Sequence, residues 1–160
     1  MTTNITTHLL APSAIPSFLL AGNALLTVLN TRTQSRHTFK ITAPGKTAQA
    51  RDEAPLLFVS ALTGPDNTAS YSYIGVYIRS TGEFRTTVKS RLGNDDPKVL
   101  CFAWLSRNAG NMADHAHVEV RHHNLCCRCG RVLTVPASID TGLGPECAKT
   151  MGKLWAVKTA

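Results

Sequence analysis

Three cysteines near the C-terminal end of the chain have the spacing of metal ligands. Cys126 and Cys129 form a C-x-x-C pair, and Gly130 follows at once. A glycine lets the backbone turn tightly, so that both thiolates can face one ion, as in a zinc knuckle. Cys147 is separated from the pair by seventeen residues and follows Gly144-Pro145-Glu146, which predicts the start of a short helix. Paired cysteines with a third at a helix start predict a zinc site.

A structural zinc site takes four ligands, so the three cysteines leave one position to fill. His122 is the predicted fourth ligand, because three residues separate it from Cys126 and the set then reads His-x3-Cys-x2-Cys-x17-Cys. The other candidates are His123, Cys127 and Cys101. Only one of two adjacent histidines on an extended segment can face inward, and Cys127 inside the knuckle is expected to point away from the ion.

Cysteines and histidines in this pattern have two other uses in proteins. A disulfide needs an oxidising compartment, and nothing in the sequence indicates export. A deaminase site is suggested by His117-Val118-Glu119 ahead of the C-x-x-C pair, but only six residues separate Glu119 from Cys126 and no proline precedes the pair. With Cys147 added, no coordination position stays open for water, so the zinc is predicted to be structural. No catalytic constellation can be assembled from the remaining residues, and we expect no enzyme activity.

The run CRCGRVLTVPASIDTGLGPECA resembles the C-terminal module of an uncharacterised family found largely in bacteriophage proteins. Upstream, LAGNALLTV, FVSALTGPDN, YSYIGVYI and KSRLG resemble the N-terminal part of the same proteins, so the resemblance extends over roughly residues 18–148. It implies the zinc module, written CxxCGRxLTxPxSxxxGxGPxC, and a histidine a few residues before the first cysteine, here His122. It implies no activity. Asn124 and the additional Cys127 depart from the family pattern, which has glycine near the knuckle.

The composition favours a polyanionic partner in a reducing compartment. The chain has 160 residues, a net charge of +7 and five cysteines without regular pairing. Excess positive charge favours partners such as nucleic acid, although it does not define a fold. No apolar run is long enough to span a membrane, and Pro12 and Pro16 interrupt what could be a signal peptide. We therefore expect a soluble cytoplasmic protein, located in the host cytoplasm if a phage encodes it.

Hydrophobic patterning predicts an α+β fold. A helix is expected over Ser13–Ala21, and a second helix from an Asp96 N-cap and Pro97 to about Arg107. Alternation and turn signals predict strands at Ala24–Asn30, His37–Thr42, Leu56–Leu62, Tyr71–Arg79 and Phe84–Ser90. The expected architecture is an antiparallel sheet with one packed helix, followed by a small zinc-knuckle module of treble-clef or ribbon type. The expected domains are residues 1–116 and 117–160, with residues 43–55 as a loop and Trp155 packing back onto the body.

One face of this sheet is predicted to bind nucleic acid. In the fourth strand tyrosines alternate with aliphatic residues, and in the fifth strand basic residues alternate with apolar ones. Aromatic rings interleaved with Arg and Lys can stack bases and hold phosphates. The predicted contact residues are Tyr71, Tyr73, Tyr77, Arg79, Arg85, Lys89 and Arg91.

Two other interpretations of this face stay open. Tyrosines also pack well on half-exposed strands, and Lys and Arg keep surfaces soluble, so the pattern is equally typical of a solvated face. The second alternative is a protein-binding modulator or inhibitor of a host system, docking through the zinc module or the tyrosine face.

Overall fold

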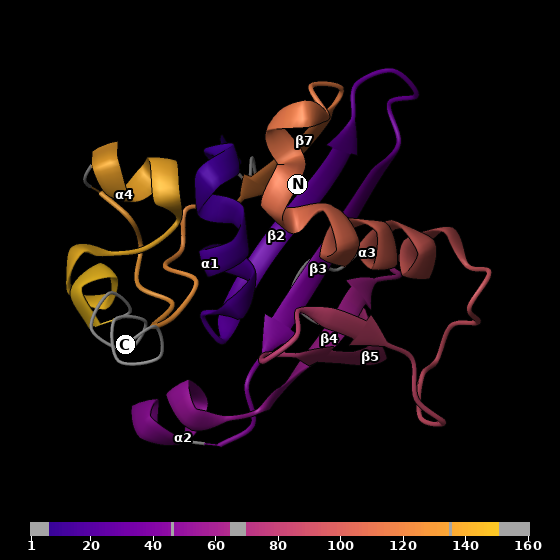
Figure 1. Ribbon diagram of the computed structural model, residues 1–160, viewed down its shortest axis with the longest axis horizontal. Helices are drawn as coiled ribbons and strands as arrows, with labels where there is room; N and C mark the ends of the chain where they lie inside the picture. The colour runs from indigo at the N-terminus through magenta and orange to yellow at the C-terminus, as the bar shows by residue number, and fades with distance from the viewer. Residues whose placement is uncertain (1–6, 46, 65–69, 135, 151–160) are drawn as a thin grey trace.

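The computed structural model describes residues 7–45, 47–64, 70–134 and 136–150. Within them a seven-stranded sheet has the order β1-β7-β2-β3-β4-β5-β6, and every neighbouring pair is antiparallel (Figure 1). The strands are β1 (His8–Leu9), β2 (Asn23–Asn30), β3 (Arg36–Thr42), β4 (Leu56–Leu62), β5 (Tyr71–Ile78), β6 (Glu83–Arg85) and β7 (Val118–His122). The predicted α+β fold with an antiparallel sheet is confirmed.

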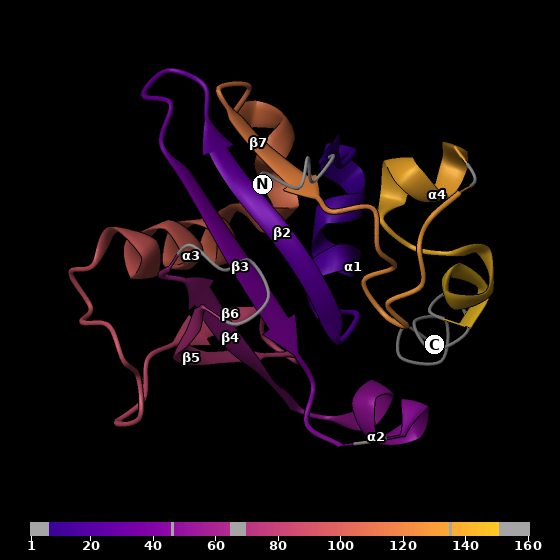
Figure 2. The ribbon, with the colours of Figure 1, turned by 180° about the vertical axis from the view of Figure 1, so that it is seen from behind.

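The described helices cover one face of the sheet, and none of them lies over β2 and β3 on the other, which we call the open face. The helices are η1 (Pro12–Ala14), α1 (Ile15–Leu20), α2 (Ala48–Glu53), α3 (Pro97–Asn108), η2 (Ala109–Asp114) and α4 (Pro136–Thr141), and residues 145–150 are also helical. In Figure 1 α1 and α3 lie in front of the long strands, whereas the reverse view in Figure 2 shows β2 and β3 without a helix over them. Among the described helices none is long and apolar enough to cross a membrane.

The core forms between α3 and the covered face. Asp96 caps α3, because its side chain accepts a hydrogen bond from the N–H of Lys98 at 2.9 Å, and Pro97 occupies the first turn. The predicted start of this helix is thus confirmed. The ring of Phe102 is fully buried and meets three aromatic rings edge-on at centroid distances of 5.0 to 5.8 Å. These rings belong to Phe39, Tyr77 and Phe84.

A β-bulge in β5 changes which side chains face the core. Val59 of β4 pairs with Gly75, but the next residue, Ser60, pairs with Tyr73, so Ile74 is the extra residue. The alternation of inward and outward side chains breaks there. Gly75 is required at this point, since a Cβ on it would lie 2.3 Å from the carbonyl oxygen of Arg85.

The structure differs from the predicted elements in two further places. Residues 43–55 were predicted as a loop but contain α2, whose N-cap Thr47 accepts a hydrogen bond from the N–H of Ala50 at 3.1 Å. The predicted fifth strand is shorter, because regular pairing ends at Arg85 and the backbone then turns, with Ser90 N–H donating to the carbonyl of Thr87. The predicted packing of Trp155 lies outside the described residues.

β7 joins the C-terminal part of the chain to the sheet. It lies between β1 and β2, with His122 opposite both His8 and Leu26. The predicted module of residues 117–160 therefore begins with a strand of the main sheet. The described rest of that segment, residues 123–134 and 136–150, lies beside α1 (Figure 1), and the N–H of Asn23 at the start of β2 donates to the carbonyl of Cys127 at 2.7 Å.

Candidate metal centre

Three of the four predicted metal ligands come together. The Sγ atoms of Cys126, Cys129 and Cys147 all lie within 4.8 Å of one another. Tetrahedral zinc with Zn–S bonds of about 2.3 Å would hold sulfurs about 3.8 Å apart, so small side-chain adjustments would close the three around one ion. The predicted cysteine ligands are confirmed as a group that could hold a metal.

The first two cysteines are positioned by a tight hairpin. Leu125 and Val132 form an antiparallel bridge, and between them the N–H of Cys126 donates to the carbonyl of Arg131 at 2.8 Å. The chain reverses where Gly130 has a φ of 80°, a conformation that favours glycine. Its N–H donates to the carbonyl of Cys126 at 2.9 Å. This is the backbone turn expected of a zinc knuckle.

The third cysteine comes from the first turn of the last described helix. The N–H of Ala148 donates to the carbonyl of Gly144 at 2.8 Å, which starts the helix, and Cys147 lies in that turn. The backbone nitrogen of Gly144 lies 3.4 Å from Sγ of Cys126. The helix start thus donates to a sulfur of the knuckle.

The surroundings of the sulfurs suit a thiolate-binding metal. Burial acts to raise the pKa of Cys126, but backbone N–H groups of Cys129, Gly144 and Arg128 outweigh it and the pKa is lowered. For Cys147 burial dominates and raises the pKa to about 11, although the bond from Arg128 opposes it. Zinc binds thiolates, and N–H donors directed at sulfur stabilise that state. The donor set therefore fits zinc.

A buried ion pair donates a hydrogen bond to the third cysteine. The guanidinium of Arg128 binds the carboxylate of Asp52 through Nε and Nη2, and its Nη1 donates to Sγ of Cys147 at 3.3 Å. Asp52 lies on α2, 76 residues from Arg128 in the chain. Sequence reasoning missed this pair, since α2 itself was predicted as a loop. The arginine inside the C-x-x-C pair was the one local signal available.

His122 does not lie with the three sulfurs. Its ring is fully buried, its Nε2 donates to the carbonyl of Ile139 at 2.5 Å, and its Nδ1 accepts from the N–H of Asn124 at 3.0 Å. Both ring nitrogens are therefore used by the backbone, and the ring is a neutral Nε2–H tautomer. Burial lowers the pKa of His122. In this arrangement His122 fastens α4 to β7, and the assignment of this residue as the fourth ligand is not supported.

The other candidates for the fourth position are also elsewhere. Cys127 is fully buried, with its backbone bonded to Asn23 and Gly142. His123 Nε2 lies 2.9 Å from the hydroxyl of Thr27 on the sheet. Cys101 belongs to α3 and is partly buried. Among the described residues, none of these three joins the cysteine group.

A cavity of about 630 Å³ opens at the metal centre. All three clustered cysteines line it, together with Ser138 and Glu146. Its cationic lining residues are Arg51, Arg128 and Arg131. The three cysteines thus line a cavity in which arginines outnumber the one carboxylate.

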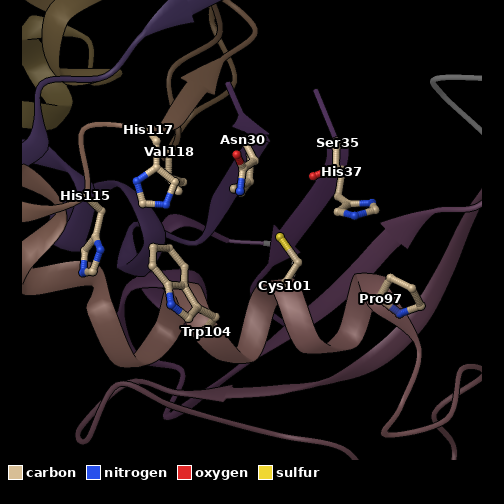
Figure 3. Close-up of a pocket in the computed structure, with 10 residues that line it drawn as sticks. Asn30, Ser35, His37, Pro97, Cys101, Trp104, His115, His117 and Val118 are labelled. Atoms are coloured by element: carbon tan, nitrogen blue, oxygen red, sulfur yellow. The ribbon is translucent and has the colours of Figure 1, made fainter. Parts of the chain in front are cut away.

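A second cavity, of about 380 Å³, lies between α3 and the β2–β3 hairpin. Figure 3 shows Cys101 and Trp104 rising from α3 toward the strands, with His115 and His117 beside Trp104. The rings of Trp104 and His115 meet edge-on at 4.9 Å. In the part of the chain that the structure describes, the group that could hold a metal is the cysteine cluster, and His115, His117 and His37 do not belong to it.

The predicted nucleic-acid face is only partly formed. Tyr71 and Tyr73 lie on the open face, half-buried, and Arg85, Lys89 and Arg91 are exposed. Tyr77 is 2% exposed and packs on Phe102, because the bulge turned it to the covered face. Its prediction as a base-stacking residue is wrong.

Arg79 is also misassigned. Its guanidinium donates to four backbone carbonyls, so it fastens the end of α1 to α2. The acceptors are Leu20, Arg51, Asp52 and Ala54. This side chain has no free donor set to offer a phosphate.

The fold and the site define an α+β protein with a group of three cysteines that could hold a metal ion. A family model described as "Family of unknown function (DUF6011)" matches residues 116–152. The match includes β7, the knuckle, α4 and Cys147, and so all three clustered cysteines. No curated protein and no solved structure matches the chain.

Proposed function

We propose that the protein is a small zinc-binding accessory protein that binds single-stranded nucleic acid through the open face of its sheet. In this proposal Zn²⁺ is held by Cys126, Cys129 and Cys147 and has a structural role. Bound there, the ion would cross-link the knuckle to the last helix. Such a link stabilises a segment that is too short to be held together by burial of apolar side chains alone. The resemblance to bacteriophage proteins supports a phage accessory role in the host cytoplasm, without an enzyme activity.

The observation that carries the nucleic-acid part is a cation beside an aromatic ring on the open face. Phe39 and Ile41 of β3 are buried, so Lys40 between them points to the opposite face. Its Nζ lies 5.2 Å from the ring centroid of Tyr71. Such a pair can stack a base and neutralise a phosphate at neighbouring positions.

The neighbours of this pair extend the surface. Tyr73 lies across from Ser60, which in turn pairs with Lys40, so the three residues form a row across the strands. The ring of Tyr73 is 6.1 Å from the ring of Phe58, which is 40% exposed. We define the open sheet face as Lys40, Phe58, Tyr71, Tyr73 and Arg85.

A specific observation also favours a protein partner. Leu9, Leu56 and Phe58 are 40% to 52% exposed, and strand register places all three on the same side of the sheet as Tyr73. Exposed apolar side chains of this kind are typical of protein interfaces. The second candidate function is therefore a protein-binding modulator of a host system that docks on this face.

Titration of labelled single-stranded DNA and RNA separates the two functions. We expect binding at low salt that falls steeply toward physiological salt, because the basic side chains displace counterions. Lys40→Ala should weaken it, whereas Arg107→Ala, an exposed arginine at the end of α3, should not. If neither polymer binds at low salt, the nucleic-acid proposal fails and the protein-binding function is favoured.

A further inference from the structure

We infer that the metal at the three cysteines takes its fourth ligand from solution, as a small anion that enters through the basic cavity. This inference rests on the proposed zinc site and adds that one coordination position of the zinc is exchangeable. A zinc ion with an exchangeable position is open to ligands, whereas a site with four protein ligands is closed.

The soft donors of the chain are its histidines and cysteines. The chain has six histidines and five cysteines, and all of them lie within the described residues. Among these, the group that can hold an ion contains Cys126, Cys129 and Cys147. His122, which the spacing made the natural fourth member, uses both ring nitrogens for backbone hydrogen bonds.

Recruiting His122 would break the contacts that hold α4. The ring would have to leave a fully buried position against Phe18 and His8 and release the carbonyl of Ile139. A buried backbone group left unpaired is destabilising, because it has lost its hydrogen bond to water without replacement. A ligand from solution needs no such rearrangement.

A cavity of about 630 Å³ lies beside the sulfurs. It is lined by the three cysteines, by three arginines and by one carboxylate, that of Glu146. Arg128 is already engaged by Asp52 and Cys147. Arg131 is exposed, and the buried Nε of Arg51 has no hydrogen-bond partner among the described residues.

The charges of the cavity select the ligand. Three thiolates on Zn²⁺ leave one net negative charge, and an anion in the fourth position adds another. Arg51 and Arg131 line the same cavity and outnumber its one carboxylate, Glu146, so they offset that added charge. A monodentate anion therefore fits the position.

X-ray absorption spectroscopy at the zinc edge tests this on the wild-type chain, after elemental analysis has established the zinc content. We expect three sulfur neighbours and one light atom, without the outer-shell scattering of an imidazole. Addition of bromide should replace the light atom by a bromine neighbour. A fourth sulfur, an imidazole pattern, or a light atom that bromide does not displace overturns the inference and leaves the zinc site itself intact. Zinc-free protein overturns both.

Arginine variants locate the entry route. Arg131→Gln and Arg51→Gln should raise the bromide concentration for half-occupancy roughly two- to fivefold, as expected for partly exposed charges. Arg107→Gln, outside the cavity, is the matched control. If all three variants take up bromide like the wild type, the basic cavity is not the route and the inference is overturned.

Discussion

The carboxylate of Asp52 accepts two hydrogen bonds from the guanidinium of Arg128, at 2.9 Å from Nε and 2.5 Å from Nη2. Both side chains are only 11% exposed. Since the same guanidinium donates to Sγ of Cys147, α2 is connected to the metal centre through one arginine. An ion pair of this kind orients a metal ligand and joins two parts of the fold.

The first prediction concerns metal content. Purified protein should contain one zinc ion per chain by elemental analysis. Cys129→Ser or Cys147→Ser should lose it, because two thiolates alone hold zinc poorly and the knuckle is no longer cross-linked to the helix. Cys101→Ser, in α3, is the matched control and should retain zinc. Full zinc in Cys147→Ser would contradict the site.

The second prediction concerns the buried ion pair. Asp52→Asn leaves the guanidinium of Arg128 without its counter-charge, so the free energy of unfolding should fall by about 3 kcal/mol. Zinc affinity, measured by competition with a chelating dye, should fall about 10- to 100-fold, as for other residues that orient a ligand.

Glu53→Gln is the control for that change. Glu53 is the neighbouring acid on α2, is exposed, and is bonded to Gln49 on the same helix. Equal effects of the two substitutions on zinc affinity would show that the link from Asp52 to Cys147 has no influence on the metal.

The third prediction concerns pH. Burial lowers the pKa of His122 below the ordinary value of 6.5, so in the folded state its ring stays neutral where the unfolded chain already binds a proton. The unfolded state then binds more protons, and stability must fall as the pH drops through 6.5 toward the lowered folded pKa. Urea unfolding at about pH 7.5 and 5.5 measures the loss.

His37 and His123 have lowered pKa values for the same first cause, burial, and contribute in the same direction. His122→Gln should therefore reduce the pH dependence without abolishing it. It should also lower stability at pH 7.5, because the bonds to Ile139 and Asn124 are lost. An unchanged pH dependence in this variant would mean that His122 titrates like an exposed histidine.

The fourth prediction separates two tyrosines of β5. Tyr77→Ala should destabilise the protein by about 3–5 kcal/mol, because a buried ring against Phe102 is removed. Tyr73→Ala should change stability little but weaken binding of single-stranded DNA by about 1–3 kcal/mol. Thermal unfolding and DNA titration of both variants test the assignment. Binding unaffected by Tyr73→Ala would show that charge alone attracts the polymer.

The fifth prediction concerns the contact between the C-terminal segment and α1. Gly142 has a φ of 73°, and a Cβ on it would lie 2.5 Å from the ring of Phe18. Gly142→Ala should therefore cost more than about 1 kcal/mol of unfolding free energy. Gly110→Ala, where a Cβ would meet nothing within 4 Å, is the control. Equal free energies of unfolding for the two variants would show that the ring of Phe18 moves aside without strain.

The sequence alone was sufficient where the determining interactions are local. The C-x-x-C-G turn, the Asp96-Pro97 helix start and the alternation of β2 and β3 each depend on residues within a few positions of one another. Backbone conformation and capping act over that range, so these features could be predicted. The cysteine triad followed as well, because a knuckle and a helix start are common ways to present thiolates.

Long-range contacts decided the rest. Tyr77 faces the core because a bulge opposite Val59 shifts the register of β5, and register depends on the neighbouring strand. Arg79 is bound by carbonyls from α1 and from the α2 segment, which the chain brings together only on folding. His122 had the right spacing for zinc, but the carbonyl of Ile139 and the N–H of Asn124 take both of its nitrogens. Spacing determines which residues can reach an ion, and the tertiary structure determines which of them are free to bind it.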